Sequence, residues 1–115
     1  MALKTTTQKN SLAAKYAADA VYGALYTTAP SSTPGTEVTG GSPAYARKAL
    51  SWGAPTNGVV TATATFDVPA GTTVVGAGVH SALTGGTYLD GGSLSSSTTF
   101  GEQGTFQVTF TYTQS

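Results

Sequence analysis

Residues 60–68, VTATATFDV, alternate apolar and polar side chains without a break. A period of two places successive side chains on opposite faces of a β-strand. One face carries only apolar groups and the other carries threonines and one carboxylate: Val60, Ala62, Ala64, Phe66 and Val68 against Thr61, Thr63, Thr65 and Asp67. The stretch therefore predicts a strand that buries one face in a core.

Two further runs share this period. Residues 105–113 place four large apolar side chains, from Phe106 to Tyr112, between threonines and a glutamine. Residues 73–82 alternate valine and alanine with glycine, so one face of this strand is nearly bare. A bare face allows a neighbour to approach closely, and we expect that neighbour to be an alanine-rich helix.

Weaker patterns predict the remaining strands and their turns. Short strands are expected over residues 24–28 and 45–52, and another begins at residues 87–89. The Asn57–Gly58 pair is a strong signal for a tight turn. Residues 90–92, Asp-Gly-Gly, predict a further turn before Ser93 and Leu94.

Two segments lack any apolar periodicity. Residues 31–43, SSTPGTEVTGGSP, hold two prolines and three glycines and predict a long surface loop. A loop of this length is often a contact element. Residues 95–99, SSSTT, predict a flexible, solvent-facing link.

Helical periodicity occurs once, over residues 8–22. Apolar side chains recur there at three- and four-residue steps while lysine and aspartate fall between them. Asn10 or Ser11 is expected to cap the helix, and Gly23 stands where a left-handed stop is common. Residues 1–7 are polar and predict an N-terminal arm.

These elements predict a mainly β fold in one domain. The chain has 115 residues, which is enough for a single core. Six strand-like runs with turns between them and one leading helix indicate a small antiparallel β-sandwich or barrel with one N-terminal α-helix. The domain is expected to span residues 8–115, with its helix at residues 8–22 and the arm in front.

The composition excludes several classes of function. Five Lys and Arg balance five Asp and Glu, and only 9% of residues are charged, so we expect neither nucleic acid nor a membrane as partner. No cysteine is present, which removes disulfides and thiolate chemistry. The most apolar stretch, residues 12–25, is interrupted by Lys15 and Asp19, so no membrane or export segment is expected. A low content of charged residues makes a free monomer less soluble, so it favours a protein that is mostly part of an assembly.

Catalytic and metal-binding patterns are weak. His80 could be combined with Ser81 or Ser93 and an aspartate, but no Gly-x-Ser-x-Gly elbow surrounds a serine. We therefore interpret His80 as a strand-end residue that bonds locally or faces a neighbouring subunit. A calcium site at Asp90 is the alternative to a simple turn there. The sequence predicts no enzyme, no metal site and no cofactor.

Five residues are interface candidates because they lie in or beside the long loop. A stacking or cation–π platform for a sugar is the alternative use of the aromatic members, but a subunit interface is the preferred interpretation. The candidates are Val38, Tyr45, Arg47, Lys48 and Trp52.

Three strings carry a family resemblance: EVTGGSPAYARKALSWG at residues 37–53, FDVPAGTTV at 66–74 and TGGTY at 84–88. In their order and spacing they resemble short virion proteins of tailed bacteriophages, described as tail-fibre-like or minor tail proteins and typical of actinobacterial phages and prophages. The resemblance covers residues 8–112. It departs at residues 25–30, LYTTAP, where a histidine and an acid are missing. It implies a particle component with no catalytic residues to transfer.

The sequence thus predicts a non-enzymatic structural protein of a phage virion, assembled in the bacterial cytoplasm. It would be a multi-copy, homo-oligomeric subunit on the particle exterior, either as a tail-fibre-like or minor tail protein or as a capsid decoration protein. Its partners would be major capsid or tail proteins and copies of itself. The alternative is a carbohydrate- or receptor-binding module that recognises a host glycan, and a hydrolase using His80 is the third reading.

Overall fold

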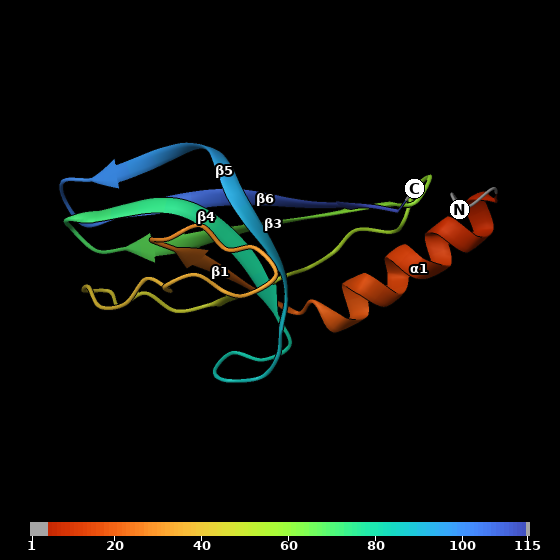
Figure 1. Ribbon diagram of the computed structural model, residues 1–115, viewed down its shortest axis with the longest axis horizontal. Helices are drawn as coiled ribbons and strands as arrows, with labels where there is room; N and C mark the ends of the chain where they lie inside the picture. The colour runs from red at the N-terminus through yellow and green to blue at the C-terminus, as the bar shows by residue number, and fades with distance from the viewer. Residues whose placement is uncertain (1–4, 115) are drawn as a thin grey trace.

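Six strands and one helix make up the computed structural model, which describes residues 5–114 (Figure 1). One antiparallel sheet has the strand order β2-β1-β4-β5, and a second consists of β3 and β6. This arrangement confirms the predicted mainly β, antiparallel architecture with one N-terminal helix, and the sheets do not close into a barrel. The elements are α1 Thr6–Asp19, β1 Tyr22–Tyr26, β2 Lys48–Ala49, β3 Val59–Val68, β4 Thr72–His80, β5 Tyr88–Phe100 and β6 Gly104–Thr113.

The core lies between the two sheets. Leu25 of β1 and Val74 of β4 face Phe66 and Val68 of β3, and none of these four side chains is exposed. Apolar burial of this kind is the main stabilising term of a small domain. The alternation in residues 60–68 therefore identified the strand that supplies most of the core from one side.

β3 and β6 form the regular part of the structure. Their register runs from Val59 opposite Thr113 to Val68 opposite Gly104 with no shift. Both strands turn threonines outward, and the hydroxyls of Thr63 and Thr109 lie 3.4 Å apart across the pair. The predicted strands at 60–68 and 105–113 are confirmed, each extended by one residue at its start.

The helix is shifted toward the N-terminus relative to the prediction. It begins at Thr6 because Thr5 caps it: the backbone N–H of Gln8 donates to Thr5 Oγ1 at 3.2 Å. Asn10 and Ser11 lie inside the helix, so the predicted caps are wrong. The arm predicted at residues 1–7 is helical at its last two residues, and residues 1–4 lie outside the described part of the chain.

The C-terminal end of the helix was also misplaced. The helix ends at Asp19, and Tyr22 already belongs to β1. Gly23 is a strand residue, not a helix stop. Its missing side chain leaves room for an aromatic ring, since a Cβ there would lie 2.9 Å from Cζ of Phe110. Gly23 thus marks a close approach between the two sheets, and the sequence alone did not distinguish this role from that of a helix cap.

The helix packs on β3 and β6 at one end of the molecule (Figure 1). The prediction that the helix covers the glycine face of β4 is wrong. That face instead meets other residues of the β-rich body: a Cβ at Gly78 would lie 2.9 Å from Tyr26 Cε2 and 3.2 Å from Tyr88 Cε1, and Gly76 lies against Pro30. No helix in residues 5–114 is long and apolar enough to cross a bilayer.

β5 was the largest error in the strand assignment. Residues 95–99, predicted as a flexible link, are strand, and the turn predicted at 90–92 lies in the same strand. Thr73 pairs with Thr99, and their hydroxyls are 3.0 Å apart. The alternation is absent because the β4–β5 register shifts twice and most of β5 faces solvent on both sides. Backbone pairing, not burial, defines this strand.

Two other elements are shorter or differently placed than expected. The strand predicted at 45–52 pairs only through Lys48 and Ala49, which form β2 opposite β1. The strand predicted at 24–28 is displaced to residues 22–26. Asn57 and Gly58 have φ values of 50° and 79°, and they close a local turn between Thr56 and Val59.

The sandwich has two unlike sides. We call the side where β2 lies next to β3 the closed side. We call the side where the edges of β5 and β6 border a common cavity the open side. On the closed side residues 36–38 also extend the edge of β1, through a bridge between Tyr26 and Glu37 and a bond from Val38 N to Leu25 O of 3.1 Å.

Candidate functional site

The predicted long loop is anchored on the closed side of the sandwich. Thr27 N donates to Thr36 O at 2.8 Å, and Val38 is only 2% exposed. The segment therefore returns to the sheet before it reaches Tyr45. Proline and glycine content indicated a loop, but they gave no sign that one valine would enter the core.

An ion pair holds this segment to a second loop. The Nε and Nη2 of Arg47 each donate to one carboxylate oxygen of Glu37, both at 3.0 Å. Nη1 of Arg47 donates to the carbonyls of Ala82 and Gly85, also at 3.0 Å. The planar guanidinium matches a carboxylate in two parallel bonds. Arg47 thus joins residues 37–47 to the turn after β4.

Tyr45 completes the polar cluster. Its hydroxyl donates to Glu37 Oε2 at 2.8 Å and accepts from Leu25 N at 2.9 Å. Its ring stacks near Phe66 with centroids 6.3 Å apart. Burial alone would raise the pKa of Glu37, but hydrogen bonds from Arg47 and Tyr45 outweigh it, so that pKa lies below its usual value. Glu37 is therefore an anion at neutral pH.

His80 lies beneath this cluster with 4% of its surface exposed. Its Nε2 is hydrogen-bonded to the hydroxyl of Tyr26, and its ring meets Tyr88 with centroids 5.5 Å apart. Burial lowers the pKa of His80, and Arg47 adds to the shift against the opposing effect of Glu37. Burial raises the pKa of Tyr26 to about 12. A neutral imidazole and a protonated phenol thus form a local structural bond.

The residues considered for a hydrolytic triad are engaged elsewhere. Ser81 Oγ accepts from Thr87 N at 2.8 Å. Asp90 accepts from Tyr16 Oη at 3.1 Å and from Gly91 N at 2.9 Å. Within residues 5–114, no three metal-ligating side chains gather at one place. The geometry of these groups is that of turn and strand stabilisation.

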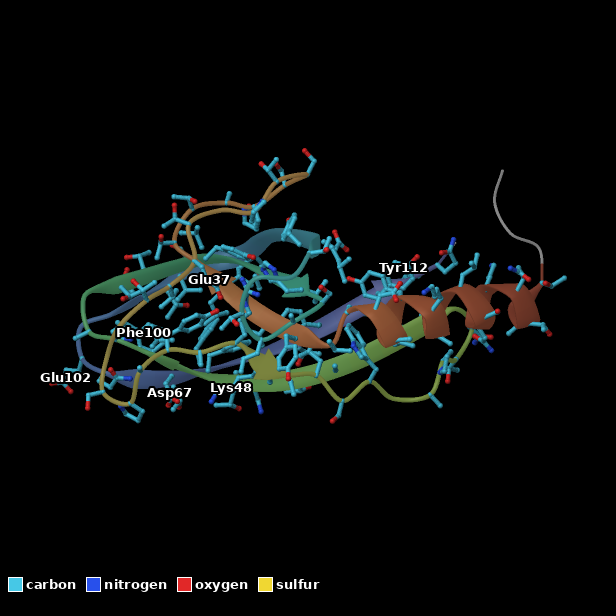
Figure 2. All side chains as sticks on the ribbon, turned by 90° about the horizontal axis from the view of Figure 1, so that it is seen from below. Glu37, Lys48, Asp67, Phe100, Glu102 and Tyr112 are labelled. Atoms are coloured by element: carbon cyan, nitrogen blue, oxygen red, sulfur yellow. The ribbon has the colours of Figure 1, made fainter. Side chains whose placement is uncertain are left out.

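A surface cavity of about 430 Å³ opens beside the ion pair. Its walls are residues 37–40, 45–47 and 83–85, and Leu83 on its rim is 48% exposed. Figure 2 shows Glu37 in the half of the molecule opposite the helix, with Lys48 and Asp67 along one margin. The cavity combines an apolar rim with a charged, polar wall, which suits a ligand with both apolar and hydroxyl groups.

A second cavity of about 260 Å³ lies on the open side. Tyr16 of the helix dominates it: its ring stacks on Tyr112 at 3.9 Å and meets Trp52 edge-on at 5.7 Å. Trp52 Nε1 donates to Ala20 O at 2.7 Å. Burial raises the pKa of Tyr16, with a further contribution from Asp90. This aromatic group fastens the end of the helix to the two sheets.

The structure separates the five interface candidates. Val38, Tyr45 and Arg47 line the first cavity, although Val38 itself is buried. Trp52 lines the second cavity, so it does not share a platform with Tyr45. Lys48 lies at the margin of β2, 3.7 Å from Asp67. Their contact with another protein stays a prediction.

Glu37 and the carbonyls of residues 82 and 85 are the site groups that sequence reasoning missed. A signal for Glu37 existed, because in a chain with 9% charged residues an acid ten positions before an arginine is a natural partner for it. The carbonyls carry no sequence signal, since any residue type supplies one.

A comparison with models of protein families gives a match over most of the chain. The model described as "Podophage GP4 fiber I protein gp80" matches residues 5–114. No curated protein and no solved structure matches the chain. The match supports the resemblance to tail-fibre-like phage proteins, while the actinobacterial type and the minor tail assignment stay predictions. Because the match covers nearly the whole chain, this protein belongs to the podophage fibre protein family.

Proposed function

We propose that the protein is a multi-copy subunit on the exterior of the virion, where it acts by packing against other virion proteins. Its family makes it a structural component of a phage particle. The finer role, as a tail-fibre-like or minor tail subunit or as a capsid decoration protein, is the proposal.

The outer face of β3 and β6 is the observation that carries this proposal. Eight exposed side chains on this face are uncharged: Thr61, Thr63, Thr65, Thr105, Gln107, Thr109, Thr111 and Thr113. Threonine loses little rotamer freedom when it is covered, in contrast to lysine or glutamate. Charged residues are depleted at the centres of protein interfaces. Apart from Asp67, which pairs with Lys48 near one end of β3, this broad and regular face is uncharged, and such a face favours permanent contact with other proteins.

A copy count in purified virions tests the proposal. Quantitative mass spectrometry should find the protein in fixed ratio to the major capsid protein. Hundreds of copies per particle would indicate head decoration, and a handful would indicate the tail. Gold-labelled antibody in electron micrographs should mark the particle exterior. Absence from purified particles, or a location inside them, would refute the proposal.

A second candidate function is recognition of a host glycan, which the cavity beside Arg47 favours. Its apolar rim and polar wall provide contacts for a sugar ring and its hydroxyls. Leu83→Arg should fill this cavity and abolish glycan binding. Leu89→Arg is the matched control, because Leu89 is 39% exposed but lines neither cavity. No binding on a broad glycan array, or equal loss in both variants, would remove this function.

A further inference from the structure

β3 and β6 are paired throughout, but their inner faces are covered to different extents. The five inward side chains of β3, from Val60 to Val68, are at most 7% exposed. On β6 only Val108 is buried, while Phe106, Phe110 and Tyr112 keep part of their surface in solvent. The apolar face of β6 is therefore only partly covered by the other residues that the structure describes.

The outer edge of β6 is also unpaired. Within residues 5–114, the backbone of this strand pairs with β3 alone. On its other side lies the second cavity, between Ser93 and Leu94 of β5 and residues 108–111 of β6. Alternate N–H and C=O groups along β6 therefore point away from its partner. A free edge of this kind is a template for another strand.

Other edges of the sandwich are protected. On the closed side Gly53 N donates to Thr61 O at 3.1 Å, and the Lys48–Asp67 pair lies over the same edge of β3 (Figure 2). β5 is irregular, because its register with β4 shifts twice. Charges and irregularities are the usual means of preventing edge pairing.

β6 has none of these protections. No charged residue and no proline occurs from Gln103 to Gln114. The strand is regular over ten residues and rich in threonine and aromatic residues, which favour β structure. A long, regular and uncharged edge favours pairing with another strand.

We propose that β6 pairs antiparallel with β6 of a second copy, so that two subunits share one four-stranded sheet with the order β3-β6-β6-β3. This pairing rests on the proposed function only in requiring several copies at one place. It identifies the contact surface, and the same two-fold axis would relate every contact in it.

The chemistry of the edge favours a copy of itself. Any antiparallel register that keeps the inner faces together sets threonine or glutamine opposite threonine or glutamine, and aromatic or valine side chains opposite their own kind. No like charges meet in any of these registers. A strand of ten residues extends about 34 Å. A specific interface needs roughly 1,000 Å² in total, and cover for Phe106 and Phe110 would add apolar area to that of the paired backbones.

Sedimentation velocity on the full chain over a range of concentrations tests the pairing. The wild-type protein should be dimeric at high concentration. Gln107→Lys with Thr109→Lys should weaken the dimer at least tenfold, because lysines then meet across the two-fold axis. Thr65→Lys with Thr63→Lys is the matched control: these residues lie directly opposite on the same exposed face, one strand away from the edge. The control should remain dimeric.

A mixed-label NMR sample gives a second measurement that does not depend on variants. Half of the molecules carry ¹³C and ¹⁵N, and intermolecular Hα–Hα contacts should appear between residues of β6. A monomer at all accessible concentrations, a dimer with contacts elsewhere, or equal weakening by both lysine pairs would overturn the inference.

The outcome is separable from that of the proposed function. A monomeric protein that is nevertheless present on purified virions would refute the β6 pairing and leave the structural role intact; protection of β6 only on the particle would then assign its edge to a different virion protein. A dimeric protein that is absent from virions would refute the structural role and leave the pairing intact.

Discussion

The closed and open sides of the sandwich are both built from antiparallel β-strands, but the edges of these strands are protected to different extents. On the closed side, backbone bonds and two ion pairs, Glu37–Arg47 and Lys48–Asp67, occupy the strand edges. On the open side, β6 ends in an unpaired edge with half-covered aromatic rings. Four of the ten charged residues thus lie on the closed side, where they hinder pairing with an outside strand, and none lies on β6. Uncharged edges are then the places to look for partners.

The largest expected effect is on the free energy of unfolding, and it differs between two phenylalanines that lie opposite each other in the β3–β6 pair. Phe66 has no exposed surface, so Phe66→Ala should lower the free energy of unfolding by about 3 to 5 kcal/mol. Phe106 is half-buried, and its removal should cost about 1 to 2 kcal/mol because the cavity is open to water. Urea unfolding at low protein concentration measures both. Equal losses would show that the two sides are covered alike.

Next in size is the ion pair of the closed side. Arg47→Ala leaves Glu37 partly buried without its partner and two carbonyls without a donor, and should cost about 2 kcal/mol. Lys48→Ala is the control, since the Lys48–Asp67 pair is longer and more exposed and should contribute at most about 0.5 kcal/mol. Thermal unfolding compared with wild type gives both values. A larger loss in Lys48→Ala would contradict the ranking.

The smallest expected effect is a pH dependence. Burial lowers the pKa of His80 below the ordinary value of 6.5, so the unfolded chain binds a proton that the folded chain refuses. Stability should be full above pH 6.5 and fall as the pH drops below it, by at most about 1.4 kcal/mol per pH unit. Urea unfolding between pH 7.5 and 5 measures the slope.

His80→Gln should flatten that slope, because His80 is the only histidine in the chain. The lowered pKa of Glu37 acts in a different range, since its contribution is lost only below its ordinary value of 4.5. Stability that stays level or rises on acidification from pH 7 would show that His80 is not held neutral.

Sequence reasoning succeeded where burial on one face enforced a period. The bounds of the strands at residues 60–68 and 105–113 were predicted within one residue, because an apolar side chain at every second position is typical of a strand with one buried face. The same alternation did not reveal that β6 is only half covered. Coverage depends on which strands lie opposite, and the sequence does not contain that information locally.

The errors at β5 and Gly23 have one physical origin, which is contact between distant residues. Within residues 95–99, Thr98 and Thr99 are strand residues that pair with Val74 and Thr73 of β4, and Ser and Thr have no apolar period that would predict this pairing. Gly23 makes room for Phe110, far along the chain. Among the site residues, Arg47 was predicted as an interface candidate from its neighbourhood, whereas the pairing of Glu37 with Arg47 became visible only in the fold.

The two ends of the long axis, which measures 47 Å, are chemically distinct. At one end, Gly58 is hydrogen-bonded to the helix and to the residue after the last strand. Its N–H donates to Asn10 Oδ1 at 2.8 Å, and its carbonyl accepts from Gln114 N at 2.8 Å. The β5–β6 turn with Glu102 lies at the far end, as Figure 2 shows. The two ends of the molecule therefore differ: one carries the helix and the end of β6, and the other carries the β5–β6 turn. A peptide inserted between Gly101 and Glu102 would be displayed at the tip, remote from any tether fused next to Gln114.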